Sequence, residues 1–205
     1  MNKKLDVRAL AILGLMTALL ILFSFTPIGT IPIGPLSITL NEIPIAMAAI
    51  ALGPVGGLVM GCVFGLLSFL QCIGVGVPSG MGAILFSIDP ALAFLQRFFP
   101  RALDGVLVGL IFRALEKKPG PRPACFLTGF FSAFLNTAFF MSALVLLFGN
   151  TDYVQGLMNG RSFLVFVCAF VGVNAVVEMV VCTLISGFVG VALYHAKILP
   201  LKNQK

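Results

Sequence analysis

Long apolar runs, interrupted by clusters of Gly and Pro, dominate the pattern of hydrophobic and polar positions along the chain. No charged residue occurs in residues 9–41, and none occurs in residues 43–88. A helix that crosses a bilayer needs about 20 predominantly apolar residues. Each of these stretches can therefore hold at least one membrane-spanning helix, and the pattern predicts an integral membrane protein.

Division of the chain at its Gly/Pro clusters and charged residues predicts an all-α fold, with residues 1–205 forming one membrane domain. The second predicted helix is too short to cross the bilayer upright, so we expect it to tilt or to be completed by the segment before it. The six predicted transmembrane helices comprise residues 7–25, 41–52, 54–72, 90–116, 122–148 and 162–196.

The composition changes this picture little and excludes several classes of protein. Of the 205 residues, 60% are hydrophobic and only 10% are charged, whereas a soluble domain contains about 25% charged residues. The net charge of +6 does not indicate a nucleic-acid-binding surface, because the basic residues lie between apolar segments and form no stripe with aromatic residues. We interpret these basic residues as topology signals.

Lys and Arg concentrate on the cytoplasmic side of membrane proteins, and this rule predicts that both termini are cytoplasmic. The outer side then keeps only Arg97, Arg101 and Arg161. The first apolar run is expected to be a retained helix, because no small-residue cleavage pattern follows it. The cytoplasmic clusters are Lys3, Lys4 and Arg8, then Arg113, Lys117, Lys118 and Arg122, and finally Lys197, Lys202 and Lys205.

Two connections on the predicted extracellular side are apolar and rich in Gly and Pro. They comprise residues 26–35 and 73–82. Because Pro and Gly disfavour a continuing helix, these segments are expected to be loops. Two such loops on one face of a helical bundle suggest a lid over a pocket, and the alternative is that they are ordinary connectors.

Small residues recur at four-residue spacing on several predicted helices, which allows two helix backbones to approach closely in lipid. The third helix has Gly53, Gly57, Gly61 and Gly65, and the fourth has Gly105 and Gly109 in the same relation. The first helix has Gly14 and Ala18. Each pattern predicts either packing within this chain or docking to a partner membrane protein.

Polar side chains inside the membrane are costly to place there and mark functional sites. Arg97 and Arg101 are four residues apart, so they share a face of the fourth helix, and Gln71 lies near the same outer side. An arginine fork can hold a carboxylate, and amide groups can bond ligand hydroxyls and amides. The polar residues that converge on an outward-facing pocket are Asn41, Glu42, Gln71, Arg97, Arg101, Asn136, Asn174 and Glu178. All of them except Glu42 are predicted to bind the ligand, together with Phe69.

Each of these charged residues also has an explanation that involves no ligand. Arg97 and Arg101 can extend along the chain surface to reach lipid headgroups. Glu42 can be a first-turn residue favoured by the helix dipole. Glu178 can pair with an Arg and only hold the bundle together.

Catalytic and energy-coupling motifs are not recognisable in the sequence. The turn from Gly53 to Gly57 is not followed by the Gly-Lys-Ser/Thr of a phosphate-binding loop. His195 lies near the cytoplasmic end, and we interpret it as a helix C-terminal residue. We therefore expect neither an enzyme nor a metal or cofactor site, and any use of ATP requires other subunits.

Several features occur together in this chain: 205 residues, six predicted helices, the pattern Gly14-x-x-x-Ala18, and a block over residues 44–57 that closes on Leu-Gly-Pro-Val-Gly-Gly. Over nearly its whole length the chain resembles the substrate-binding S components of energy-coupling factor (ECF) vitamin transporters. The segments most similar to the pantothenate-type branch are 38–44, 65–69 and 99–103.

The resemblance implies a multi-pass protein of the bacterial cell membrane that captures a vitamin with high affinity, most simply pantothenate. It also implies a partner transmembrane component, two ATPase subunits, and toppling of the S component within the membrane to deliver the ligand. The small-residue surface at Gly14 and Ala18 would be the docking face.

Other functions remain open at this point. An S component for folate, riboflavin or a thiamine precursor should place ring-stacking side chains near the pocket, and Phe64, Phe69 and Tyr153 are the candidates. A membrane-embedded lipid-modifying enzyme needs a catalytic cluster, which Glu178 alone does not supply. A small channel or secondary transporter often has duplicated halves, and no repeat is visible here.

The predicted topology can be tested by cysteine labelling of intact cells. Because the basic clusters place the fourth connection inside, a membrane-impermeant reagent should label cysteines introduced at Asp152 or Gly160 and should not label one at Gly120. Labelling at Gly120 would contradict cytoplasmic termini.

Overall fold

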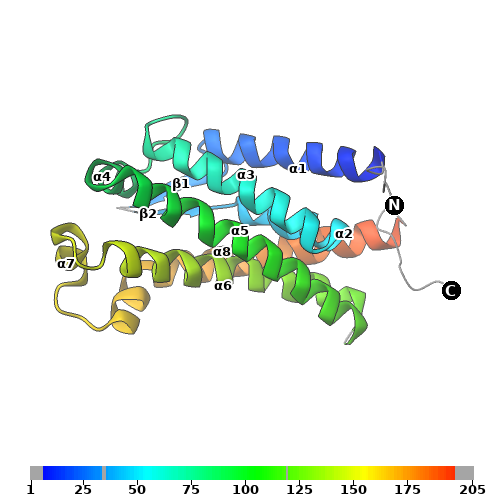
Figure 1. Cartoon of the computed structure of the whole chain (residues 1–205). Coiled ribbons are helices and arrows are strands. Elements are labelled where there is room, and N and C mark those ends of the chain that lie inside the picture. Colours follow the sequence, from blue (N-terminus) through cyan, green and yellow to red (C-terminus); the bar gives the residue numbers. More distant parts are fainter. Residues whose placement is uncertain (1–6, 34–35, 119, 197–205) are drawn as a thin grey trace, which may run out of the picture.

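The computed structural model describes residues 7–33, 36–118 and 120–196 and shows an elongated bundle of helices with one small hairpin (Figure 1). Helical segments extend from the first to the last described residues, as expected of an all-α membrane fold. In chain order the elements are α1 (Val7–Phe25), β1 (Thr30–Ile33), β2 (Leu36–Thr39), α2 (Glu42–Leu52), α3 (Pro54–Cys72), α4 (Gly80–Ile88), α5 (Pro90–Lys117), α6 (Pro121–Phe148), α7 (Asp152–Met158) and α8 (Phe163–His195).

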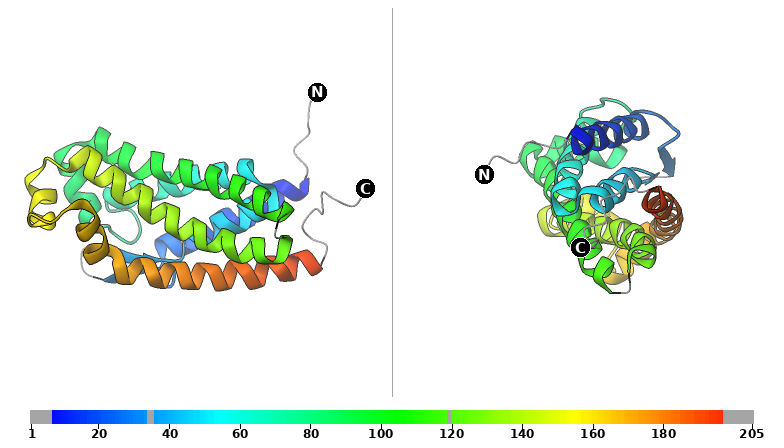
Figure 2. Two further views of the ribbon diagram at one scale, coloured as in Figure 1. Left: turned by 90° about the horizontal axis from the view of Figure 1, so that it is seen from below. Right: turned by 90° about the vertical axis from the view of Figure 1, so that its right-hand side faces the viewer.

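Four helices, α1, α3, α6 and α8, are long and apolar enough to cross a membrane. Helix α2 is apolar but has only 11 residues. Helix α5 is long enough at 28 residues, but it carries several charged residues. The long helices run alongside one another in both views (Figure 2). The protein is therefore a multi-pass membrane protein, and α2 and α5 complete the bundle around its polar interior.

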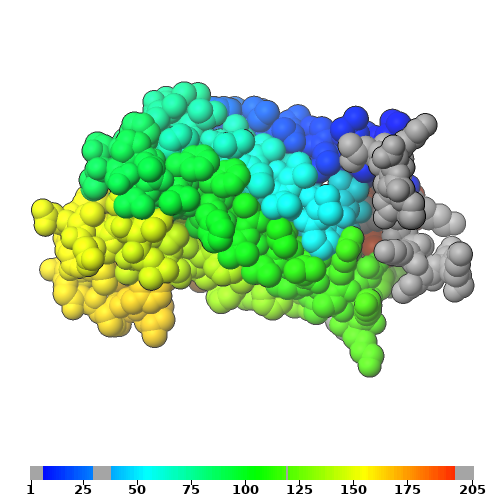
Figure 3. Space-filling view, viewed as in Figure 1, coloured from blue at the N-terminus to red at the C-terminus, as the bar shows by residue number. Residues whose placement is uncertain are grey.

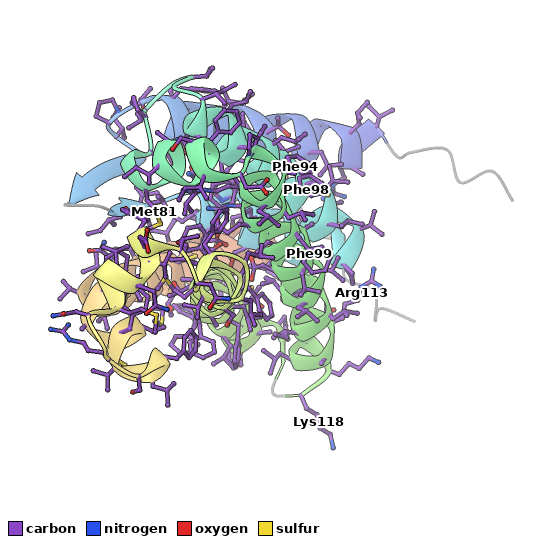
Figure 4. All side chains as sticks on the ribbon, turned by 60° about the vertical axis from the view of Figure 1, so that its left-hand side comes forward. Met81, Phe94, Phe98, Phe99, Arg113 and Lys118 are labelled. Carbon is purple, nitrogen blue, oxygen red and sulfur yellow. The ribbon has the colours of Figure 1, made fainter. Side chains whose placement is uncertain are left out.

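The two ends of the bundle differ in structure. Helix α1 begins and α8 ends at one end, and β1, β2, α4 and α7 gather at the other (Figures 1 and 2). Figure 4 places Met81 near the hairpin end, whereas Arg113 and Lys118 lie toward the opposite end. The basic residues of the α5–α6 connection thus share an end with the start of α1.

The two Gly/Pro-rich connections contain more regular structure than the sequence pattern predicted. Strands β1 and β2 pair in antiparallel register, with Thr30 opposite Thr39 and Ile33 opposite Leu36. Helix α4 begins inside the second connection, where the Ser79 hydroxyl accepts a hydrogen bond from the Gly82 N–H at 3.1 Å. A cap of this kind initiates a helix even in a Gly-rich segment, which hydrophobic periodicity alone does not reveal.

Caps also separate the short helices from their neighbours. Asp89 stands between α4 and α5 and accepts hydrogen bonds from the N–H groups of Ala91 at 2.8 Å and Leu92 at 3.0 Å. Thr151 caps α7 in the same way through the Val154 N–H. Neither α4 nor α7 was predicted, because helices of nine and seven residues are too short to show a clear period.

Glycines allow α3 and α5 to pack with their backbones in contact. A Cβ atom at Gly57 would overlap the carbonyl oxygen of Gly105, and one at Gly61 would overlap the carbonyl oxygen of Arg101. A Cβ atom at Gly109 would likewise overlap the backbone of Pro54. The glycine stripes of these two helices therefore serve packing within this chain, which was one of the two alternatives.

The small residues of α1 have a different environment. A Cβ atom at Gly14 would meet no atom within 4 Å, and both Gly14 and Ala18 are exposed. Their neighbour Leu15 is 59% exposed. In the apolar 18-residue stretch of α1, only 17% of the residues are buried inside the chain, whereas 56% are buried in the corresponding stretch of α3. The small-residue face of α1 has no partner among the described residues of this chain.

We expect Gly57→Ala to destabilise the protein, because the added methyl group would push α3 and α5 apart. Overpacking of this kind typically costs about 1–3 kcal/mol of unfolding free energy. Thermal unfolding in detergent should show a lower midpoint for Gly57→Ala and an unchanged or slightly raised one for Gly14→Ala, which fills open space. Equal midpoints for the two variants would contradict the close packing of α3 and α5.

Candidate functional site

A polar cavity of about 160 Å³ lies inside the bundle, between α3, α5, α6 and α8 and beneath the segment that leads into α4. On the face shown in Figure 3, the side chains of α3, α5 and α6 close over the bundle, so the cavity is internal on that side. Its lining comprises Thr39, Asn41, Phe64, Ser68, Gln71, Val77, Pro78, Ser79, Gly80, Met81, Arg97, Arg101, Asn136, Thr137, Phe140, Met141, Val171, Asn174, Ala175 and Glu178.

Two arginines from α5 supply the positive charge of the cavity. Arg97 is 5% exposed and Arg101 is 6% exposed, so neither extends along the surface toward lipid headgroups. The Arg101 guanidinium lies 4.5 Å from the ring centre of Phe64 and 5.1 Å from that of Phe140. Such cation–π contacts stabilise a desolvated guanidinium without using its hydrogen-bond donors.

The donors of Arg101 are only partly used. One terminal nitrogen, Nη1, donates to the carbonyl oxygen of Arg97 at 2.9 Å, and Nε has no hydrogen-bond partner. A buried donor without a partner is costly, and a ligand that supplies an acceptor would remove this cost. Arg101 therefore keeps unused hydrogen-bonding capacity beside the cavity.

Arg97 is held more fully than Arg101, and it contacts the segment that covers the cavity. Its Nη1 donates to the Ser68 hydroxyl at 3.4 Å, and its Nη2 donates to the Ser79 hydroxyl at 3.1 Å. A Cβ atom at Gly82 would come within 2.9 Å of Arg97 Nη2 and 2.6 Å of Cys72 Sγ, so a larger residue there would displace these side chains. Arg97 thus joins the start of α4 to the wall of the cavity.

The opposite wall offers oxygen atoms rather than positive charge. Glu178 on α8 accepts hydrogen bonds from the backbone N–H of Thr39 at 2.6 Å and from its hydroxyl at 3.3 Å. These bonds tie the end of β2 to α8 inside the cavity. Asn136 is 8% exposed and its side-chain oxygen has no partner, so it can accept a hydrogen bond from a ligand.

Gln71 and Asn41 line the cavity but also hold α1. The Gln71 side-chain nitrogen donates to the Ser24 carbonyl oxygen at 2.8 Å, and the Ser24 hydroxyl donates to the Asn41 side-chain oxygen at 3.4 Å. Both residues therefore combine structural and potential ligand contacts.

Of the side chains predicted to bind ligand, only Phe69 lies outside the cavity lining. Its ring packs against Phe86 at 5.9 Å and Phe94 at 5.2 Å between ring centres. Phe94 in turn stacks on Phe98, and both appear on α5 in Figure 4. Phe69 therefore belongs to an aromatic cluster that joins α3, α4 and α5.

Sequence reasoning missed several lining residues. Phe140 lies four residues after Asn136 and Ser68 lies three before Gln71, so helical spacing alone could have placed both on the polar faces. Ser79 lies in a segment that was expected to be a loop, and Thr39 lies between the other predicted loop and the second predicted helix, so no periodic signal could have found them. The hydroxyl of Ser79, which caps α4, connects this helix to Arg97.

A second polar cluster lies deeper in the bundle, next to Arg101. Glu42 is 1% exposed, and its Oε2 accepts a hydrogen bond from the Ser132 hydroxyl at 2.7 Å. Asp104, one helical turn beyond Arg101, is fully buried. Glu42 therefore has a buried side-chain hydrogen bond in addition to its place in the first turn of α2. Among the described residues, no group of three His, Cys, Asp or Glu side chains is placed to hold a metal ion.

Comparison with known proteins places this architecture in a family. Residues 8–189 match the family model described as "ECF transporter, substrate-specific component". The chain belongs to this family. Members of the family are S components, which are transport proteins and not enzymes, so the polar cavity of this S component is a candidate site for binding and not for catalysis.

Two relatives resemble this S component over nearly its whole length. The chain is 27% identical to the pantothenic acid transporter PanT of Lactococcus lactis subsp. cremoris (strain MG1363), over 96% of this chain and 97% of PanT. A solved structure, the S-component for biotin from an ECF-type ABC transporter, aligns over 98% of this chain and 96% of its own with a TM-score of 0.58. At 17% identity, the second similarity supports the fold alone.

Proposed function

We propose that this S component captures pantothenate, or a closely similar small carboxylate, from outside a bacterial cell for import by partner subunits. The observation that carries the proposal is the buried Arg101 guanidinium, which faces a cavity with an unpaired Nε. Similarity to a pantothenic acid transporter along nearly the whole chain supports this choice of ligand.

The chemistry of the cavity fits an anion that also carries hydroxyl and amide groups. Arg101 would hold the carboxylate, because a guanidinium matches its two oxygens. Asn136, Asn174 and Gln71 would bond the polar middle of the ligand, and Glu178 offers an acceptor for a hydroxyl. Apolar side chains such as Met81, Met141 and Val171 form part of the remaining wall, as in most small-molecule sites.

A flat aromatic vitamin is less well matched by this cavity. The two rings that line it, Phe64 and Phe140, already lie against the guanidinium of Arg101. Phe69, which was a candidate stacking residue, packs outside the lining. We therefore prefer pantothenate to folate or riboflavin.

The proposed topology has six membrane-spanning segments, with α2 and α5 added to the four clear spans, and both termini in the cytoplasm. The arrangement supports it, because the start of α1 and the end of α8 share one end of the bundle (Figure 1). The positive-inside rule assigns that end to the cytoplasm. The cavity then lies toward the outer side, where β1, β2 and α4 cover it.

Import by this S component would require a transmembrane component and two ATPase subunits in the plasma membrane. The exposed face of α1 around Gly14 and Ala18 is the proposed docking surface. Two observations support it: Gly14 has open space around it, and the glycine stripes of α3 and α5 are already used inside the chain.

We expect Arg101→Ala to weaken pantothenate binding, because it removes a charged hydrogen-bond donor. A hydrogen bond to a charged group contributes about 1.5–3 kcal/mol, which corresponds to roughly a tenfold to hundredfold change in Kd. Arg101→Lys should recover only part of the loss, since an ammonium cannot make the paired contact. Calorimetric titration of the purified protein measures both effects.

The control for this experiment is Arg161→Ala, which removes an exposed positive charge outside the cavity lining. It should leave the Kd unchanged. A folded Arg101→Ala protein with the wild-type Kd would exclude the proposed role of Arg101. Titration with other vitamins on the same samples would show whether a different ligand is bound.

We expect Gly14→Trp or Ala18→Trp to block assembly with the transmembrane component and the ATPases, because a large ring would prevent close helix contact. Pantothenate binding should survive in both variants, since neither residue lines the cavity. Gly172→Trp on α8 is the matched control, because Gly172 also has open space around it. Co-purification of the intact complex with the Gly14→Trp variant would contradict the docking surface. Accumulation of pantothenate in liposomes by this chain alone, without ATP, would contradict the need for partner subunits.

A further inference from the structure

The buried acidic residues beneath the cavity are not explained by ligand contacts. Glu42 begins α2, Asp104 lies on α5, and Ser132 on α6 donates a hydrogen bond to Glu42. Neither carboxyl group lines the cavity, and neither is more than 1% exposed. Three helices thus bring two acids together where water does not reach.

The two carboxyl groups lie close enough to interact with each other. Apart from this interaction, Glu42 Oε1 and both side-chain oxygens of Asp104 have no hydrogen-bond donor. A hydrogen bond between two carboxyl groups requires a proton on one of them. Two adjacent carboxylates without donors would also repel each other strongly at low dielectric. Both observations indicate that the pair holds one proton in the ligand-free protein.

With one proton, the pair has a single negative charge and acts as a counter-ion of Arg101. Glu42 and Asp104 both interact electrostatically with Arg101. Arg97 and Glu178 both line the cavity and add one positive and one negative charge to it. The site as a whole is then neutral, which matters because an uncompensated buried charge is very unfavourable.

An anionic ligand upsets this balance. When a carboxylate takes over the charge of Arg101, the carboxyl pair beneath loses its counter-ion, and the site has one excess negative charge. The other groups that interact with the pair are Ser132, Glu178 and the Cys182 thiol. None of them carries positive charge. Uptake of a second proton by the pair restores neutrality.

We propose that Glu42 and Asp104 form a proton-storing pair. The pair has one negative charge and balances Arg101 when the cavity is empty, and it takes up one proton when a carboxylate ligand binds. This inference rests on the proposed function, since it requires a carboxylate ligand at Arg101. Glu42 and Asp104 are positioning residues, because they act through Arg101 and do not touch the ligand.

The sign of the pH dependence follows from this proton uptake. Because binding takes up a proton, higher pH opposes binding. Around neutral pH a carboxylate ligand stays ionised, so the Kd should rise with pH by up to about tenfold per pH unit where uptake approaches one proton. Ligand binding that merely needs Arg101 would show no such slope, because arginine does not titrate in this range.

Proton uptake can be measured by titrating the purified full chain with pantothenate near neutral pH in buffers of different ionisation enthalpy, such as phosphate and Tris. The binding enthalpy of the wild-type protein should differ between the buffers by an amount that corresponds to nearly one proton. In the double variant Glu42→Gln with Asp104→Asn, the difference should vanish while pantothenate still binds.

Asp89→Asn is the matched control, because it makes the same change on α5 at a capping position that Asn also serves; its buffer dependence should equal that of the wild type. Equal enthalpies in all buffers for a wild-type protein that binds pantothenate would overturn the inference alone. A buffer dependence that persists in the double variant would assign the proton to another group, such as Glu178, and would also overturn it. No binding heat in any buffer would contradict the proposed function and, with it, this inference.

Infrared difference spectroscopy keeps the inference testable if the double variant does not fold. Addition of pantothenate to the wild-type protein should increase the absorption of protonated carboxyl groups. Carbon-13 labelling of aspartate shifts part of that band if Asp104 shares the proton. A ligand-bound protein without this increase would overturn the proposed proton uptake.

Discussion

The close contact between α3 and α5 is the constraint on which the rest of the structure depends. Gly57 and Gly61 leave no side chain between the two backbones, so the large side chains of α5 must leave on its other faces. Arg97 and Arg101 therefore enter the interior of the bundle, where α6 and α8 complete the cavity. A stripe of residues without side chains thus determines where the most polar side chains of the protein lie.

Burying two guanidinium groups then determines what surrounds them. A desolvated arginine is tolerated only beside aromatic rings, hydroxyl groups or carboxyl groups, and this protein uses all three. Phe64 and Phe140 flank Arg101, the hydroxyls of Ser68 and Ser79 hold Arg97, and the carboxyl groups of Glu42 and Asp104 lie beneath. Because the carboxyl groups compensate the arginines, the interior is neutral as a whole, and Arg101 still offers a local site for an anion.

The sequence predicted the long helices well, because their apolar runs are bounded by Pro, Gly and charges. Helices α1 and α3 have the predicted bounds, α5 and α6 differ from prediction by one residue at one end, and α8 differs by one residue at each end. The polar residues of these helices were also recognised as converging, since each is costly in a membrane. What could not be predicted depends on single caps and on three-dimensional contacts. Helix α4 exists because Ser79 caps it, and Asp104 was overlooked because its carboxyl partner, Glu42, is distant in the sequence.

The bonds between Thr39 and Glu178 have a kinetic consequence. They join the hairpin end, which covers the cavity, to the wall of α8 through one carboxylate. In the proposed topology, a ligand that leaves past the hairpin would require these hydrogen bonds to break, whatever contacts it makes inside the cavity. Residence time and equilibrium affinity would then be separable properties: the first would depend on the bonds between the hairpin and α8, and the second on the contacts inside the cavity.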